Sequence, residues 1–215
     1  MIALFAVAFF AADGGKLTVS EAKTDIPNEL SADVRSELDP HAVSVADDSP
    51  LLTVWFRRSI PVRATAEQLA NGLTYREIPE GTLLGAVRFA RAFVDYRKQT
   101  VPAGVYTLRF AVQPEVGDHL GTTPHPEFAL LGPADKDRSP DPVEPKGLIK
   151  MSSGVTGGDH PSVMLLWPHR GAGKPAIADR EPGARVLALM RPVSADGGDA
   201  RLGFALTVAG HSKSR

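Results

Sequence analysis

The sequence predicts an all-β protein, mainly an antiparallel β-sandwich of the Ig-like or jelly-roll-like kind, with long Pro/Gly-rich loops and at most one or two short helices. Two observations lead to this prediction. Glycine occurs 20 times and proline 18 times in 215 residues, and both weaken helix interiors while they favour turns between strands. Short runs of alternating bulky and small or polar side chains also recur along the chain, which is the periodicity of half-buried strands.

The first half of the chain contains several segments with this periodicity. We expect strands at residues 17–22, 41–46, 51–58 and, as two pieces bent near residues 90–92, at 82–98. The last segment also fits a helical stripe, and its strand-like neighbours favour two strands. Residues 65–71, followed by Gly72, have the hydroxyl and the terminal glycine of a short helix, although a polar loop fits them nearly as well. Residues 30–38 could form a second brief helix.

A β-hairpin is the clearest local prediction. Residues 95–113 contain two runs joined by Pro102-Ala103-Gly104, a ready-made turn. In the second run the bulky side chains share one face, those of Tyr106, Leu108, Phe110 and Val112. Residues 114–158 then form a long irregular region with one strand-like piece at 128–131. Three apolar segments close the chain, at residues 163–167, 186–190 and 202–208.

The run DYRKQTVPAGVYTLRFAVQP at residues 95–114, with the later GDHLG and the terminal LTVAGH, resembles a poorly characterised group of exported bacterial β-sandwich proteins. In that group a proline-alanine-glycine turn precedes a YTL strand. The resemblance covers about a third of the chain, and its motif is structural. It therefore implies the fold and names no activity.

The N-terminus predicts export. Residues 1–12 are uninterrupted apolar residues and Asp13 begins a polar stretch, as in a signal or leader segment followed by a mature start. Twelve helical residues reach about 18 Å, short of the roughly 30 Å hydrocarbon layer, so we expect no integral membrane anchor. We therefore predict a leader at 1–12, a single β-sandwich domain at 13–215, and a periplasmic or secreted location.

Charge and cysteine content exclude several functions. The formal net charge is −1, which leaves no surplus positive field for nucleic acid, so we expect no nucleic-acid partner. The chain contains no cysteine, which excludes disulfides, thiolate-bound zinc and thiol catalysis. There is no G-x-S-x-G nucleophile motif. The Gly-Ala-Gly-Lys run at 171–174 is no phosphate-binding loop, because Pro168 occupies the first glycine position and Pro175 the Ser/Thr position.

A repeated triplet is the most suggestive chemical feature. Gly-Asp-His occurs at residues 117–119 and 158–160, and His125 follows the first copy. If the loops converge, His119, His160, Asp118 and His125 could bind one divalent metal such as zinc, which would activate a water molecule. The alternative is that Gly-Asp supports a turn and that each histidine is an ordinary loop residue. We favour this second interpretation and expect no cofactor.

Trp55 and Arg57 are candidate ligand contacts. Both lie on the face opposite Leu52, Val54 and Phe56, where an aromatic ring could stack on a sugar or a peptide. In a covered sandwich, however, such a ring is more often buried. We therefore predict a non-catalytic binding or structural module of the bacterial envelope or periplasm, with a protein or glycan ligand. The alternative is a small metal-binding protein or metal-dependent hydrolase built on the two Gly-Asp-His loops.

Overall fold

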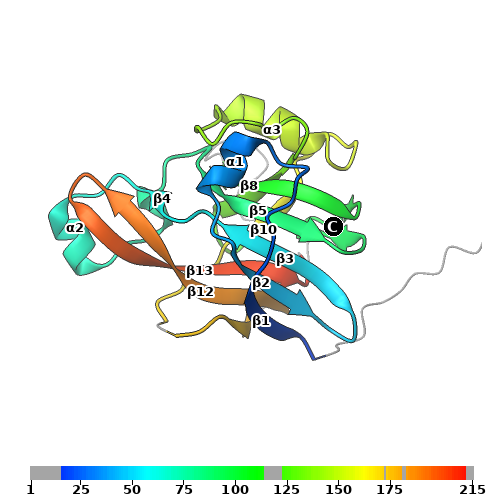
Figure 1. Ribbon diagram of the computed structural model, residues 1–215, viewed down its shortest axis with the longest axis horizontal. Coiled ribbons are helices and arrows are strands. Elements are labelled where there is room, and N and C mark those ends of the chain that lie inside the picture. Colours follow the sequence, from blue (N-terminus) through cyan, green and yellow to red (C-terminus); the bar gives the residue numbers. More distant parts are fainter. Residues whose placement is uncertain (1–15, 114–122, 172, 181–182, 212–215) are drawn as a thin grey trace, which may run out of the picture.

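The structure is a computed structural model that describes residues 16–113, 123–171, 173–180 and 183–211. The predicted leader at 1–12 lies outside these residues. Two largely antiparallel sheets pack against each other as a sandwich, which confirms the predicted fold class (Figure 1).

The large sheet is a meander in which each strand pairs with the next strand of that sheet along the chain, in antiparallel orientation. Its order is β1 (Thr18–Lys23), β2 (His41–Ala46), β3 (Pro50–Phe56), β5 (Leu83–Phe89), β8 (Gly104–Val112), β9 (Glu127–Pro133) and β10 (Val163–Leu165).

The second sheet is dominated by a long hairpin. Its strands are β11 (Ala176–Arg180), β12 (Ala184–Ala195) and β13 (Gly198–Ala209), and β4 (Ile60–Pro61) pairs in parallel with β12. Figure 1 shows the β12–β13 ribbon extending beyond the sandwich, with α2 (Ala66–Asn71) and β4 beside it. The sheets join at one corner, where Leu166 bridges Leu206 and the Trp167 amide donates to the Ala205 carbonyl at 2.9 Å.

The core lies between the two sheets. Tyr106, Leu108 and Phe110 of β8 pack in the same cluster as Phe204 and its alternate neighbours Leu202, Leu206 and Val208 of β13. The predicted period-two burial is therefore confirmed in both strands, because every second side chain enters one shared interior. Val112, the last residue of β8, is the exception, since it is 38% exposed.

The described residues contain three short α-helices, where the sequence predicted at most two. α1 (Ala32–Glu37) lies within the segment 30–38 that could form a helix, and α2 confirms the predicted cap because the Thr65 hydroxyl accepts from the Gln68 amide at 3.2 Å. α3 (Pro145–Ser153) lies in the region predicted to be irregular. Its buried Leu148 packs on the outer face of β8 and β9, so tertiary burial stabilises this short helix. A 3₁₀ turn, η1, spans Tyr75–Glu77.

The predicted bend in residues 82–98 is confirmed and the predicted hairpin is wrong. β5 ends at Phe89, and β6 (Phe93–Val94) pairs with β7 (Thr100–Val101) in a separate small sheet. The Pro102–Gly104 turn follows β7, yet β8 pairs with β5 and β9. The physical reason is length: β5 offers seven apolar-rich residues for pairing, whereas β7 offers two.

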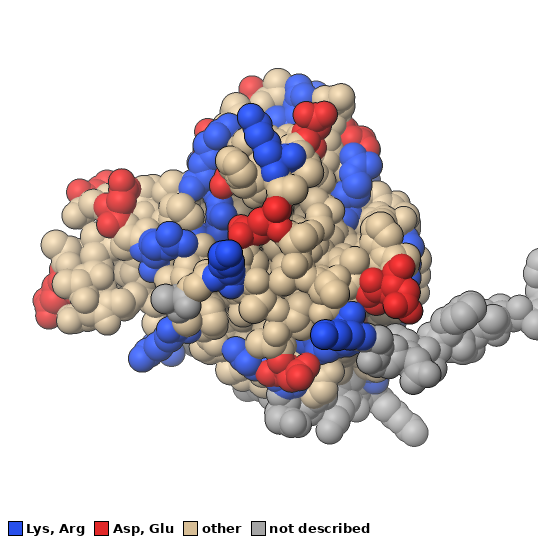
Figure 2. Space-filling model, turned by 60° about the horizontal axis from the view of Figure 1, so that its bottom comes forward, with Lys and Arg blue, Asp and Glu red and all other residues tan. Residues whose placement is uncertain are grey.

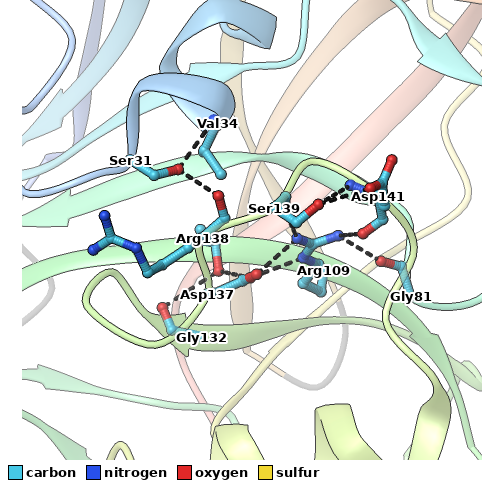
Figure 3. A network of polar contacts seen from close by, with 10 residues as sticks. Ser31, Val34, Gly81, Arg109, Gly132, Asp137, Arg138, Ser139 and Asp141 are labelled. Atoms are coloured by element: carbon cyan, nitrogen blue, oxygen red, sulfur yellow. Dashed lines mark hydrogen bonds and ion pairs between the residues drawn. The ribbon is translucent and has the colours of Figure 1, made fainter.

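Both faces of β8 are buried, because the loop after β9 covers the outer one. There the Arg109 guanidinium forms a two-pronged ion pair with Asp137, with Nε–Oδ2 at 2.8 Å and Nη2–Oδ1 at 2.7 Å. The Thr107 hydroxyl also donates to Asp137. The remaining Arg109 protons go to the carbonyls of Gly81, Ser139 and Asp141 (Figure 3).

This ion pair anchors the loop that leads into α3. Arg109 and Asp137 are 0% and 3% exposed, so their charges need every one of these partners. The loop they hold leads directly into Pro145, the first residue of α3, and the Val143 amide donates to the Gly81 carbonyl at 3.2 Å. Arg109 therefore fixes the approach of α3 to the sheet.

Candidate functional site

An apolar cavity of about 670 Å³ opens between α3, the ends of β8 and β9, and the segment that leads into β10. Its volume lies in the range typical of small-molecule sites, roughly 300–1,000 Å³. Most of the wall is hydrocarbon, contributed by Phe110, Ala111, Val112, Phe128, Leu130, Pro145, Leu148, Ile149, Pro161 and Val163.

Exposed apolar side chains gather at this cavity. Among the described residues, the large hydrophobic side chains that are exposed are Val94, Val112 and Ile149, and Val112 and Ile149 both line the cavity. Ile149 comes from α3 and Val112 from the end of β8. An apolar wall that remains in contact with solvent is typical of a binding site.

One wall of the cavity is organised by a buried carboxylate. Asp95, which is 0% exposed, accepts hydrogen bonds from the amides of Arg97 (2.9 Å), Gln99 (2.8 Å) and Val163 (3.1 Å). It also accepts one from the Gln99 side chain at 3.0 Å, and the same Nε2 donates to the Pro161 carbonyl at 2.9 Å. Asp95 therefore holds two cavity-lining segments together, one carrying Arg97 and the other carrying His160.

The turn held by Asp95 has a constrained backbone. Lys98 has a φ of 67°, and among the described residues it is the one non-glycine with a positive φ. This region is costly for a residue with a Cβ and is seen where surrounding contacts determine the conformation. The Lys98 amide donates to the Asp95 carbonyl at 3.0 Å. Asp95 therefore supplies contacts that determine the backbone conformation of this turn.

Burial raises the pKa of Asp95, although its four hydrogen bonds oppose the shift. In the unfolded chain this carboxyl titrates near 3.8. The folded state therefore holds the proton to higher pH, and the stability linked to that proton is lost as pH rises from 3.8 through the folded pKa. We expect the stability advantage of wild type over Asp95→Asn to shrink over this interval in urea unfolding. If the stability difference between wild type and Asp95→Asn instead widens with pH, the hydrogen bonds to Asp95 outweigh its desolvation.

The structure describes two of the four residues of the predicted metal site, His160 and His125. His160 is exposed and lines the cavity. His125 packs edge-on against the Trp167 ring, with centroids 4.9 Å apart, and burial there lowers its pKa despite the opposing charge of Glu127. His119 and Asp118 lie outside the described residues. Within the described ones, no three metal-binding side chains gather, so the metal hypothesis stays a prediction.

Trp55 and Arg57 both contact α1 or its C-terminal end. Trp55 is 3% exposed, packs beneath α1 with Val34 and Leu38, and donates from Nε1 to the Thr24 hydroxyl at 3.1 Å. The expectation of a ring that faces a ligand is therefore corrected: a helix covers this face of the sheet. The Arg57 guanidinium pairs with Glu37 at 2.9 Å, at the C-terminal end of α1.

Charges are mixed in sign on one face of the molecule. On the face shown in Figure 2, basic and acidic side chains lie among each other. This face provides no extended field of one sign for a polyanion. Within the parts of the chain that the structure describes, no helix is long and apolar enough to cross a bilayer.

The cavity is the feature that sequence reasoning missed. Its lining comes from segments far apart in the chain, from Glu80 to Val163, and no local pattern brings them together. One signal was present: Leu148 and Ile149 are apolar residues between two lysines in a Pro/Asp-rich stretch. That pattern would have indicated a short amphipathic helix.

The fold and the cavity together define a β-sandwich protein with an apolar site of small-molecule size on the outer face of its large sheet. Comparison with protein-family models, curated proteins and solved structures finds no match to this chain.

Proposed function

We propose that this protein is a non-catalytic binding module whose ligand inserts an apolar group into the cavity beside α3. The observation that carries the proposal is the pairing of a 670 Å³ apolar cavity with two exposed apolar side chains at its wall, Val112 and Ile149. Covering such surface with a ligand contributes about 25 cal/mol for each Å² removed from water.

The lining favours a hydrophobic ligand over a glycan. Sugar hydroxyls need hydrogen-bonding partners over most of the ring, whereas most of the described wall is hydrocarbon. The Thr123 hydroxyl of this wall already contacts Gln113 Oε1 at 3.0 Å and the His125 carbonyl at 2.8 Å. Within the bacterial envelope or periplasm, where the leader-like N-terminus would direct the chain, the proposed role is capture of a small apolar or amphipathic molecule.

The proposal is tested with the neutral fluorescent probe N-phenyl-1-naphthylamine and the full chain. We expect saturable binding of one probe per chain. Ile149→Glu should weaken it about tenfold or more, because desolvating a carboxylate against an apolar ligand costs more than about 1.4 kcal/mol.

Val94→Glu is the matched control. Like Ile149, Val94 is an exposed β-branched hydrophobic residue, and 49% of its surface is exposed. It lies on β6 and not in the cavity wall. Its variant should bind the probe like wild type, and thermal unfolding should show both variants folded. Absence of saturable binding, or equal weakening by the two variants, would overturn the proposal.

A further inference from the structure

We infer that the occupant of the cavity is an amphipathic anion, an apolar molecule with one carboxylate headgroup that pairs with the guanidinium of Arg97. This inference rests on the proposed function and adds the chemical class of the ligand.

Arg97 is a cation of the cavity wall without a partner among the described residues. Of these residues, four with titratable side chains line the cavity: Glu80, Arg97, Asp159 and His160. Glu80 is already engaged, because its Oε1 accepts from the Val112 amide at 2.8 Å. The Arg97 guanidinium makes no hydrogen bond or ion pair with any residue that the structure describes. An anionic headgroup would supply the partner that the fold does not.

The backbone that carries Arg97 is fixed before any ligand arrives. The Arg97 amide is held by the buried Asp95 carboxylate, and Lys98 completes the constrained turn. A backbone segment that is already ordered lowers the entropy lost when a ligand binds. The guanidinium itself presents a planar fork of donors that matches both oxygens of a carboxylate.

His160 provides a second donor at the same cavity. It directly precedes Pro161, whose carbonyl is tied to Gln99 and thereby to Asp95. An imidazole ring carries an N–H donor in either protonation state. One buried carboxylate thus positions the two segments that bear the donors for a headgroup, while the hydrocarbon wall accepts the apolar body.

Asp159 is the group that would favour a cationic ligand over an anionic one. Its carboxylate lines the cavity but is exposed and follows two glycines. Arg97 is exposed too, so solvent and salt screen both charges alike. Arg97 differs in that its backbone amide is held by the buried Asp95 carboxylate. A cationic amphiphile would select Asp159 and Glu80 instead, and this difference makes the sign of the ligand measurable.

The test compares three probes with the same alkyl chain, decanoate, decanol and decyltrimethylammonium, by calorimetric titration of the full chain at pH 8. We expect decanoate to bind about tenfold tighter than decanol, since hydrogen bonds to charged groups have roughly that effect. Arg97→Gln should abolish this preference. Arg88→Gln, on exposed Arg88 outside the cavity wall, should keep it.

The outcomes separate the two proposals. If no probe binds, the proposed function fails. If decanol binds as tightly as decanoate, the binding function stands and the anionic headgroup is refuted. Tightest binding of decyltrimethylammonium, or a preference for decanoate that survives in Arg97→Gln, would likewise overturn the inference about Arg97. Thermal unfolding of each variant shows that the compared proteins are folded.

Discussion

Asp137→Ala is expected to lower the free energy of unfolding by about 3–5 kcal/mol, the range for breaking a buried ion pair from one side. The reason is the Arg109 guanidinium, which is 0% exposed and would keep its charge without a counter-ion. Urea unfolding at neutral pH measures the loss. Because Asp137 lies in the loop that leads to α3, probe binding in the cavity should weaken as well.

Two comparisons show whether burial is the cause. Glu29→Ala breaks the Arg88–Glu29 pair, whose side chains are 44% and 52% exposed, and should cost at most about 1 kcal/mol. The double variant Arg109→Met/Asp137→Leu removes both charges and should recover part of the loss. Full recovery is not expected, because the carbonyls of Gly81, Ser139 and Asp141 lose their donor. A loss in Asp137→Ala no larger than in Glu29→Ala would contradict this account.

Phe204→Ala is the second large effect, with an expected loss of about 3–5 kcal/mol from removal of a buried aromatic ring. Phe204 of β13 is 1% exposed and its ring lies 6.4 Å from that of Phe56 on β3 and 5.3 Å from that of Tyr75. The substitution therefore opens a cavity between the two sheets. Chemical denaturation with tryptophan fluorescence measures the change.

The control is Val94→Ala, which shortens an exposed side chain and should change stability by less than about 0.5 kcal/mol. If Phe204→Ala were as mild as Val94→Ala, the two sheets would not share the interior described above. The difference between the two losses measures the effect of burial at Phe204.

The strands were predictable wherever one face is buried in a shared core. Residues 41–46 form β2 with the predicted bounds, and the break after Phe89 follows the predicted bend. Partner choice was less accessible, because β8 follows a good turn and still pairs with β5. A turn fixes the direction of the chain, whereas pairing depends on which strand offers more buried contact.

The second faces of β3 and β8 are buried, although alternation alone would leave them facing solvent. Arg109 alternates with Leu108 and Phe110 as a solvent-facing residue would, but a loop from 28 residues later supplies Asp137 and covers it. Trp55 is buried for the same kind of reason, under α1. In both cases the covering element is distant in sequence, so period-two alternation identifies the two faces and does not reveal whether the second one meets water.

The sequence by itself determined the all-β class, the absence of cysteine chemistry and the near-neutral charge, because composition and local periodicity act through each residue's own conformational and solvation preferences. The tertiary structure alone decided the strand partners, the burial of Arg109 and the cavity that joins Ile149, Arg97 and His160. These depend on contacts between segments tens of residues apart, and such contacts form only when the whole chain has packed.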